Sequence, residues 1–462
     1  MFKISNLKIR EDLSDYEVFK IAIKKNKIDE NDILEWYISK KSIDARKKED
    51  IYYNYSINLN IKNKQKYKFL EEIKDFEMPH INIKNTFTNP PIIIGAGPAG
   101  LFSALILIQN NIAPIIIEQG EKVEERCETV NHFVQRGELN QYSNVQFGEG
   151  GAGTFSDGKL TTGIHSPFCK KVLQEFVNFG APKEILYLSK PHLGTDNLVN
   201  IVKNIRKYII SQGGIFLFNT KAIDFEISNN KIKSVITKNI KTLTEDKINT
   251  DSVILAIGHS SRDTFEKLYE RGFLMKKKNF SVGVRIEHLQ NSINKAQYGL
   301  NPKLHLPPAD YKLTYHSPNG RTCYTFCMCP GGRVIASSSE KNTIVTNGMS
   351  NYLRNETNAN SAVLVSVTPD DFSDSNVLSG INFQKELEKK AFKLGGSNYF
   401  APIQRLEDFI NNQKSEFIGK IVPSYTPGTT LSNLNEILPL FISETLKKGI
   451  RFFDTKLKRF CR

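Results

Sequence analysis

The sequence has few cysteines and no long apolar run, and each absence excludes a class of protein. Only 6 of the 462 residues are cysteine, which is too few for the disulfide framework of a secreted protein. Residues 1–19 lack the apolar region of a signal peptide, and nowhere do about 18 apolar residues follow one another. The sequence therefore predicts a protein of the reducing cytoplasm without a membrane span.

The composition predicts a folded chain of several domains with a dispersed positive charge. The chain is 39% hydrophobic and 24% charged, and at roughly 150 residues per domain it would form about three units. The net charge is +14, but lysine is abundant throughout and no long basic run stands apart. We therefore expect a solvated surface and no nucleic acid partner.

Residues 1–85 are predicted to form a small α+β domain with a linker. Ser14 and Glu17 have the spacing of a capping box at a helix start, and residues 51–61 alternate apolar and polar side chains as a half-buried strand does. The stretch 61–90 has the composition of a lysine-rich helix and a linker. It ends at two prolines, where a new domain should begin.

Residues 91–118 have the pattern of a βαβ unit that binds a dinucleotide. A buried strand leads into Gly95-x-Gly97-x-x-Gly100, which opens an amphipathic helix, and a second strand ends at Glu118. The glycines permit a tight turn, a close approach of a pyrophosphate and close packing of helix on strand. Glu118 lies where a carboxylate can accept bonds from both ribose hydroxyls of an adenosine, which disfavours a 2′-phosphate.

A second glycine-rich segment follows between Gly148 and Gly158. Its glycines let the backbone come very near a planar ligand. Ser156, Asp157 and Lys159 add polar groups, and amide donors with a cation beside a flavin would stabilise its reduced anion. The alternative is a mobile surface loop.

Five segments together resemble the bacterial FAD-dependent dehydrogenase family of unassigned substrate, and the resemblance extends to about Phe460. The segments are FGEGGAGTFSDGKLTTG at 147–163, AIGHSSRDTF at 256–265, FSVGVRIEH at 280–288, YTFCMCPGGRVIASSSE at 324–340 and VTNGMSNYLRNETNANSA at 345–362.

The resemblance implies an α/β fold in which a Rossmann-like FAD-binding domain with a parallel sheet is interrupted by a mixed α+β substrate domain. The strands between 213 and 257 should return to the nucleotide-binding sheet. The expected domains are the N-terminal domain 1–85, the FAD-binding domain 90–262, the substrate domain 263–415, and a return to the FAD-binding domain at 416–462.

The glycine turns and the resemblance together predict a set of FAD-contacting residues. Only one complete glycine fingerprint occurs, so NADH or NADPH would act as a transient reductant without a domain of its own. The predicted contacts are Gly95, Gly97, Pro98, Ala99, Gly100, Glu118, Gln119, Arg126, Gly150, Gly151, Ser156, Gly158, Lys159, Lys221, Ala222 and Gly258.

Cys323, Cys327 and Cys329 form a cluster with three interpretations. They could be buried structural thiols, thiols beside the flavin, or part of a metal site. Cys327 and Cys329 should face the same side of a strand. Structural zinc prefers C-x₂₋₄-C pairs and four ligands, so the spacing argues against a metal.

Other polar residues are candidates for chemistry beside a flavin. His259 follows Gly258 and could act as an acid or base, or could be an ordinary loop histidine. In the strand 280–288, Arg285 and Glu287 share a face while His288 turns away. Arg285 could anchor a substrate, although a cross-sheet ion pair is an alternative. The predicted catalytic residues are His259, Lys159, Cys327 and Cys329.

The predicted function is an FAD-dependent oxidoreductase that transfers a hydride between flavin N5 and an unidentified small organic substrate. One alternative is an RNA- or partner-binding module in which the flavin fold is a scaffold. Another is a truncated or inactive flavin-fold protein, because the chain stops at Arg462 where the resembling family continues with a glycine-rich Gly-Glu segment. On that interpretation we expect weak FAD retention. The sequence predicts no oligomeric state.

Overall fold

The computed structural model describes residues 1–74, 87–300, 302–372, 375–458 and 460–461. The chain divides into two compact units. Unit 1 comprises Met1–Ile81, Lys159–Leu193 and Asn291–Asp310, and unit 2 comprises Asn82–Gly158, Gly194–Gln290 and Tyr311–Arg462. The four domain ranges expected from the sequence stay a prediction. No helix among the described residues is long and apolar enough to cross a membrane.

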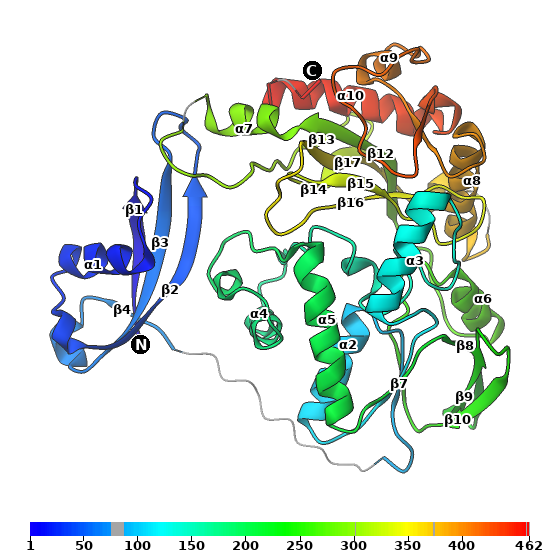
Figure 1. The fold of residues 1–462 in the computed structure, drawn as a ribbon, viewed down its shortest axis with the longest axis horizontal. Helices are drawn as coiled ribbons and strands as arrows, with labels where there is room; N and C mark the ends of the chain where they lie inside the picture. Colours follow the sequence, from blue (N-terminus) through cyan, green and yellow to red (C-terminus); the bar gives the residue numbers. More distant parts are fainter. Residues whose placement is uncertain (75–86, 301, 373–374, 459, 462) are drawn as a thin grey trace. The chain divides into compact units, whose positions relative to one another are not determined.

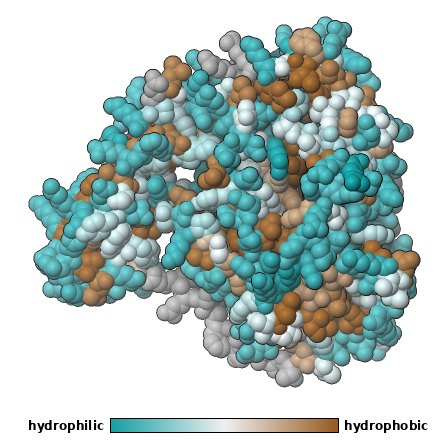
Figure 2. Space-filling view, viewed as in Figure 1, coloured by the Kyte–Doolittle hydropathy of each residue, from teal (hydrophilic) through white to brown (hydrophobic). Residues whose placement is uncertain are grey.

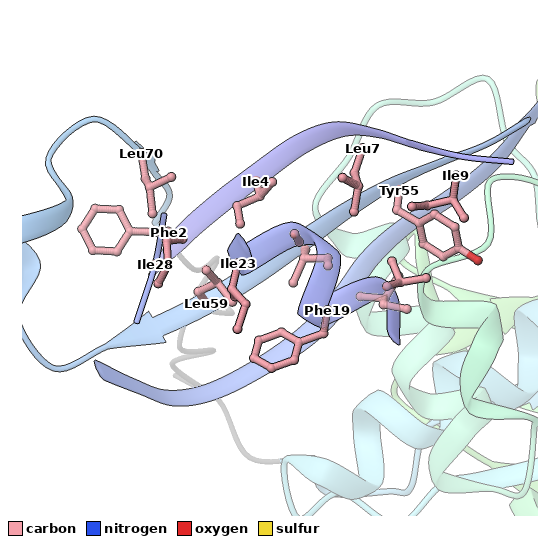
Figure 3. Close-up of a cluster of buried hydrophobic side chains, with 14 of the residues drawn as sticks. Phe2, Ile4, Leu7, Ile9, Phe19, Ile23, Ile28, Tyr55, Leu59 and Leu70 are labelled. Atoms are coloured by element: carbon pink, nitrogen blue, oxygen red, sulfur yellow. The ribbon is translucent and has the colours of Figure 1, made fainter. Parts of the chain in front are cut away.

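Unit 1 is built around an antiparallel sheet with the strand order β2-β3-β1-β4. The predicted capping box is confirmed, since Ser14 and Glu17 exchange bonds at the start of α1. The side chains of α1 and the sheet form one apolar core (Figure 3). The elements are β1 (Phe2–Ile9), α1 (Asp15–Lys25), η1 (Glu30–Asp32), β2 (Ile33–Asp44), β3 (Tyr52–Ile61) and β4 (Glu71–Glu72).

The predicted lysine-rich helix within 61–90 is wrong for the residues that the structure describes there. The chain forms only a short 3₁₀ helix, η2 (Lys64–Tyr67), before β4, and residues 75–86 lie outside the described residues. Tyr67 and Leu70 instead join the apolar core of the N-terminal sheet, and Glu71 and Glu72 pair with β1, so the segment ends in a strand. Unit 1 also contains α4 (Phe168–Asn178) and η4 (Lys183–Leu186).

The core of unit 2 is a parallel sheet with the order β11-β5-β6-β7. The strands are short isoleucine-rich runs, as expected where helices cover both faces. The predicted βαβ unit and the α/β fold class are confirmed. The elements are β5 (Ile92–Ile94), α2 (Pro98–Gln109), β6 (Ile115–Ile117), α3 (Val123–Arg136), η3 (Gly151–Gly153), α5 (Gly194–Ser211), β7 (Ile215–Leu217) and β11 (Val253–Leu255).

The strands between 213 and 257 only partly return to the nucleotide-binding sheet. β7 and β11 join it, but β8 (Thr220–Ser228), β9 (Lys231–Asn239) and β10 (Glu245–Asn249) form a separate antiparallel sheet. The hairpin turn at Asn229 and Asn230 places both residues in the left-handed region. A two-residue turn of this kind pairs β8 with β9 directly, which removes both from the parallel sheet. Helix α6 (Arg262–Glu270) follows β11.

A second antiparallel sheet of unit 2 has the order β12-β17-β14-β13. Helix α10 lies along one face and the β15-β16 hairpin packs on the other (Figure 1). Helix α7 (Gln290–Tyr298) belongs to unit 1 from Asn291 onward. The elements of this part of unit 2 are β12 (Phe280–Leu289), β13 (Thr314–His316), β14 (Thr322–Cys329), β15 (Arg333–Ala336), β16 (Thr346–Met349), β17 (Asn358–Val367), η5 (Pro369–Asp371), α8 (Ser379–Leu394), β18 (Ala401–Ile403), α9 (Leu406–Ile410), β19 (Thr429–Leu431), η6 (Leu434–Glu436) and α10 (Leu440–Lys456).

Within residues 416–462, the described elements pack on strands other than those of the parallel sheet, and the assignment of this range to the FAD-binding domain stays a prediction. β19 pairs with β18, and α10 packs on β12, β13, β14 and β17 instead of the parallel sheet. The reason is the apolar stripe Ile442, Leu446, Ile450 and Phe453, which is buried. Its spacing of three or four residues is that of a helix, but the sequence does not state which sheet the stripe covers.

Candidate functional site

The turn between β5 and α2 has the geometry of an anion-binding helix start. Gly95 has φ +105, and a Cβ on Gly100 would come 1.9 Å from the Gly95 carbonyl oxygen, so neither position accepts a side chain. None of the described residues caps α2 with a side chain, while Pro98 and Ala99 are exposed. The first amide groups of the helix therefore remain available to a phosphate.

Glu118, at the end of β6, is bound to the backbone around this turn. Its Oε2 accepts a bond from the Ala96 amide at 2.8 Å, and its Oε1 accepts from the amides of Gly120 at 2.9 Å and Gly148 at 3.1 Å. A carboxylate offers about four acceptor positions. One position therefore remains, whereas the sequence led us to expect bonds to both ribose hydroxyls.

The glycine-rich loop is fastened by Arg126, which lies on α3. This guanidinium is 0% exposed, and it donates to the carbonyls of Asn144 at 2.8 Å, Val145 at 3.0 Å and Glu149 at 2.7 Å. Burial lowers its pKa to about 10. These contacts assign Arg126 to holding the loop, and a direct contact with FAD stays a prediction.

The loop lies directly against the first glycine turn. The Gly150 amide donates to the Ala96 carbonyl at 2.8 Å, and a Cβ on Gly151 would come 3.1 Å from the Cα of Gly97. Such a close approach needs glycine on both segments. The two glycine-rich motifs, far apart in the sequence, therefore meet.

A buried carboxylate that the sequence analysis missed lies within this loop. Glu149 accepts a bond from the Val123 amide at 2.8 Å and from Arg206 Nη1 at 2.7 Å, while its Oε1 has no hydrogen-bond partner within the described chain. Burial is the largest influence and raises the pKa of Glu149 to about 7. The sequence features that could have indicated this buried pair are an acid inside the glycine-rich motif and an arginine on the apolar face of α5.

The end of the loop is fixed by side chains on both sides. Ser156 Oγ donates to the Gly153 carbonyl at 2.7 Å and accepts from the Gly158 amide at 3.0 Å. Asp157 accepts two bonds from Arg354, at 2.9 and 2.5 Å. Lys159 belongs to unit 1, where its backbone pairs with His192.

The residues predicted to flank adenosine lie near the ends of strands. The Thr220 amide donates to the Glu118 carbonyl at 3.0 Å, which brings the start of β8 beside Glu118 and Gln119. Ala222 packs in the apolar cluster of this sheet, and Lys221 pairs with Asp263. Gly258 has φ +69 and follows β11, whose Ala256 carbonyl lies against Gly95.

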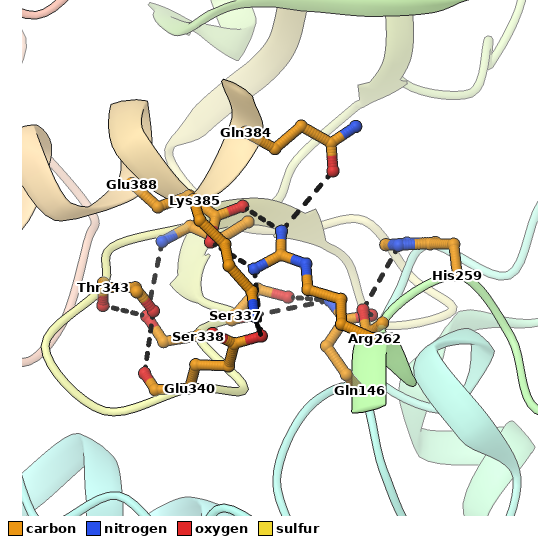
Figure 4. Close-up of polar contacts among 12 residues, drawn as sticks. Gln146, His259, Arg262, Ser337, Ser338, Glu340, Thr343, Gln384, Lys385 and Glu388 are labelled. Atoms are coloured by element: carbon orange, nitrogen blue, oxygen red, sulfur yellow. Dashed lines mark hydrogen bonds and ion pairs between the residues drawn. The ribbon is translucent and has the colours of Figure 1, made fainter. Parts of the chain in front are cut away.

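His259 is exposed and belongs to a polar network (Figure 4). Its Nδ1 lies 3.2 Å from Ser260 Oγ, which is 3.4 Å from Gln146 Oε1. Gln146 in turn bonds to Ser337. The turn at Gly258 is thus connected to the loop before the first glycine of the second motif.

The same network contains a buried arginine, Arg262. It donates to both carboxylate oxygens of Glu388 on α8, at 2.6 and 2.9 Å, and to Glu340 at 3.2 Å. These bonds fasten α6 to α8 and to the segment after β15. No periodic pattern of residues indicates these bonds, because the partners are far apart in the chain.

The cysteine cluster does not have the strand geometry predicted from its spacing. The pairing of β14 with β17 shifts between Phe326 and Cys329, and Cys327 has φ +44. This bulge breaks the alternation that would place Cys327 and Cys329 on the same side. Cys323 and Cys329 are buried, whereas Cys327 is half-buried. Across the described residues, no group of three or more His, Cys, Asp or Glu side chains could hold a metal.

The polar residues of β12 have different partners from those expected. His288 is buried, lies 3.0 Å from the Tyr311 hydroxyl, and has its pKa lowered to about 4 by burial. Glu287 accepts from the Ser424 amide and from Asn358. Arg285 donates to Asn360 Oδ1 at 2.7 Å and to the Cys327 carbonyl at 2.8 Å. Arg285 therefore makes no cross-sheet ion pair with any described residue.

A separate open pocket of about 700 Å³ lies beside α3. The surface along this helix is predominantly hydrophilic in Figure 2. The pocket was not predicted from the sequence. It is lined by Glu128, Thr129, His132, Gly137, Glu138, Leu139, Asn140, Lys341, Asn342 and Tyr399.

Comparisons with known proteins agree with this architecture. Residues 279–462 match the family model "FAD-dependent protein, C-terminal domain-like", and residues 1–60 match "Domain of unknown function (DUF8436)". An uncharacterized protein of Clostridium beijerinckii is 46% identical over 469 residues, covering 99% of this chain and 86% of that protein. The chain is thus a flavoprotein of the FAD-dependent oxidoreductase fold. It belongs to the family of FAD-dependent proteins that includes the Clostridium beijerinckii protein.

Two further similarities are more limited. A D-amino acid dehydrogenase of Helicobacter pylori is 36% identical over 75 residues, which are 16% of each chain. The glycerol-3-phosphate dehydrogenase from Bacillus halodurans complexed with FAD is 12% identical, with a TM-score of 0.29, and the match covers 81% of this chain and 66% of that one. A TM-score this low assigns neither a substrate nor a reaction.

Proposed function

We propose that this chain is an FAD-dependent oxidoreductase that passes a hydride between FAD and a small organic substrate. FAD supplies the hydride chemistry when bound. The proposal is carried by one junction, where the open N-terminus of α2, the carboxylate of Glu118 and the glycine-rich loop meet. The Glu118 bonds to the Ala96 and Gly148 amides join all three elements.

The junction fits the parts of FAD in order. The uncapped amides of α2 would bind the pyrophosphate, and the positive end of the helix would stabilise its charge. The remaining acceptor position of Glu118 would bind one ribose hydroxyl. Flanking contacts would come from Gly95, Gly97, Pro98, Ala99, Gly100, Gln119, Lys221, Ala222 and Gly258, and the loop contacts from Gly150, Gly151, Ser156, Gly158 and Lys159.

His259 is the strongest candidate for moving a proton. Its imidazole is exposed and hydrogen-bonded to Ser260, so it can exchange protons with solvent. Cys327 is half-buried and Cys329 is buried, which makes the Cys327 thiol the more accessible of the two. NADH or NADPH would reduce the protein in a transient encounter.

Flavin content and electron donor can be tested together. Purified protein should show the absorption bands of oxidised flavin after gel filtration, and mixing with NADH or NADPH in a stopped-flow instrument should bleach them. If the protein loses FAD during purification, it should rebind FAD that is added afterwards. A chain that neither retains nor rebinds FAD would contradict the proposal.

The carboxylate of Glu118 provides the residue-level test. Glu118→Ala should weaken FAD binding by about 1.5–3 kcal/mol, or about 10–100-fold, as measured by quenching of flavin fluorescence. Glu118→Gln removes the negative charge but keeps the shape of the side chain, so it separates the two contributions to FAD binding. Glu125→Gln, an exposed acid on α3, is the matched control and should bind FAD normally. Equal FAD affinity in all four proteins would exclude Glu118 from the site.

The structure offers little support for the RNA-binding alternative. The aromatic side chains that suggested it are Tyr52, Tyr53 and Tyr55, which are 8%, 8% and 2% exposed. Stacking on a base needs an open ring face. These tyrosines instead belong to the sheet of unit 1.

A further inference from the structure

The side chain of Arg285 has an unusual environment on the face of the β12-β17-β14-β13 sheet. It is half-buried, and all its hydrogen bonds within the described chain go to acceptors without charge. These are Asn360 Oδ1 at 2.7 Å, the Cys327 carbonyl at 2.8 Å and Cys329 Sγ at 3.7 Å. Buried charges are normally paired with an opposite charge. Arg321, a half-buried arginine directly before β14, follows that rule by pairing with Asp371.

Two sets of donors around Arg285 have no acceptor. The bonds of Arg285 use Nε and Nη2, which leaves Nη1 without a partner among the described residues. The Nδ2 group of Asn360 is buried and also has none. Its amide orientation is fixed, because the Nε–H of Arg285 is a donor and must face the oxygen. The guanidinium and the carboxamide thus present donors that an anionic acceptor would satisfy.

The backbone of β16 packs closely against the pair. A Cβ on Gly348 of β16 would come 2.1 Å from Arg285 Nη2 and 2.3 Å from Asn360 Oδ1, so no side chain fits there. The bulge at Cys327 turns its carbonyl toward Arg285. Bulges commonly re-aim groups next to active sites.

This pair lies close to the loop that we assign to the flavin. Gly348 is followed by Met349, which packs in one buried cluster with Phe155 of the glycine-rich loop. Gly331, two residues after Cys329, lies against the carbonyl of Arg354, and Arg354 holds Asp157 of the same loop. Contiguous packing thus joins the Arg285 environment to the proposed flavin site.

We propose that Arg285 and Asn360 bind the carboxylate of the substrate, so that the substrate class is a small organic acid. This inference rests on the proposed function for its meaning as a substrate site. Two oxygens of a carboxylate match the planar fork of a guanidinium, and the bond is charge-assisted. The carboxylate would also provide the counter-charge that Arg285 lacks.

Ligand-induced stabilisation tests this without any need for turnover. The probes are acetate, glycolate and benzoate at constant ionic strength, with acetamide and benzamide as neutral isosteres and inorganic phosphate as a different anion. A ligand that binds only the folded chain raises its melting temperature with concentration. We expect at least one carboxylate to raise it, and the amides and phosphate to leave it unchanged.

Variants identify the residues responsible. Arg285→Met should weaken carboxylate binding about 10–100-fold, the effect of losing charge-assisted bonds, and Arg285→Lys should lie between. Asn360→Asp supplies an internal counter-charge to Arg285 and should also abolish the response, although a purely structural role predicts that this variant binds normally. Arg321→Met is the matched control and should respond like the parent.

The outcomes separate this inference from the proposed function. Unchanged carboxylate binding in both Arg285→Met and Asn360→Asp overturns it, as does stabilisation by phosphate or amides equal to that by carboxylates. No response to any carboxylate also overturns it. Flavin content is measured separately by absorbance, so a chain that binds carboxylates but no FAD would refute only the proposed function.

Discussion

The N-terminal sheet and the glycine-rich loop are held in place by opposite means. In the sheet, apolar side chains from α1 and from β1 to β3 form one continuous core, and Phe19 stacks on Trp36 with ring centroids 4.3 Å apart. The loop at Gly148–Gly158 has few side chains that could form such a core. Its backbone is instead bound by buried polar groups, mainly Arg126, Glu149 and Asp157.

The difference follows from the requirement that the backbone of a nucleotide-binding loop comes close to its ligand. Glycine allows the backbone to approach a ligand, but it removes the apolar contacts that would fix the loop. Phe155 packs in a buried apolar cluster, and buried charged groups bind much of the rest of the loop. The sheet should therefore be sensitive to lost volume, and the loop to lost charge and to pH.

The largest effect should come from Arg126. Arg126→Met leaves several buried carbonyls without donors, and we expect a loss of at least about 4 kcal/mol in the free energy of unfolding. Arg136→Met, at the exposed end of the same helix, should change it by less than about 0.5 kcal/mol. Urea unfolding and limited proteolysis of the loop measure both. If the protease cuts the loop equally slowly in both variants, Arg126 does not hold the loop, and the contrast with the apolar sheet fails.

The apolar core of the sheet should respond to a cavity. Leu59→Ala removes a fully buried side chain and should cost about 3 kcal/mol, with faster amide exchange in β1 to β3 of the intact chain. Leu34→Ala, on a side chain that is 58% exposed, is the control. The Leu59 effect should be the same at pH 5 and pH 8, and a strong pH dependence would contradict an apolar core.

The loop should show the pH dependence that the sheet lacks. The pKa of Glu149 is raised from 4.5 to about 7, mainly by burial. The folded chain thus holds this proton more tightly, so the stabilisation is complete below about pH 4.5 and is lost as the pH rises toward 7, by up to about 3 kcal/mol.

Glu149→Gln removes this titration. Relative to the parent, the variant should gain stability between pH 5 and pH 8, as measured by urea unfolding at each pH. Glu128→Gln, an exposed acid on the same helix as Arg126, should follow the parent at every pH. Parallel curves for the parent and Glu149→Gln would show that Glu149 has an ordinary pKa.

The smallest effect concerns the helix start in the N-terminal sheet region. Ser14→Ala removes the side chain that accepts a bond from the Glu17 amide and should destabilise α1 by about 1 kcal/mol. Amide exchange in α1 is the measurement, with Ser5→Ala on β1 as the control. An effect larger than that of Leu59→Ala would mean that polar caps, and not the apolar core, hold this region.

Local pattern predicted the nucleotide-binding unit well. The turn at Gly95–Gly100, the helix after it and the acid at Glu118 all lie within 24 residues, where chain connectivity alone brings them together. The lysine-rich helix failed because β4 pairs with β1, about 70 residues earlier in the chain, and local composition does not encode that pairing. The prediction that Cys327 and Cys329 lie on the same side of a strand was wrong, because the bulge depends on the partner strand, which lies about 30 residues away.

The sequence by itself determined that residues 91–118 fold as a βαβ unit with an open helix start, since glycine sterics and apolar spacing act locally. Tertiary structure alone decided that Gly97 meets Gly151, that Arg126 binds the carbonyls of the loop, and that α10 covers the antiparallel sheet. It also decided that Arg285 has Asn360 as a partner and no acid among the described residues. The physical reason is that a buried polar group takes whichever donor or acceptor folding brings within about 3 Å, and a linear pattern of residue types does not encode that distance.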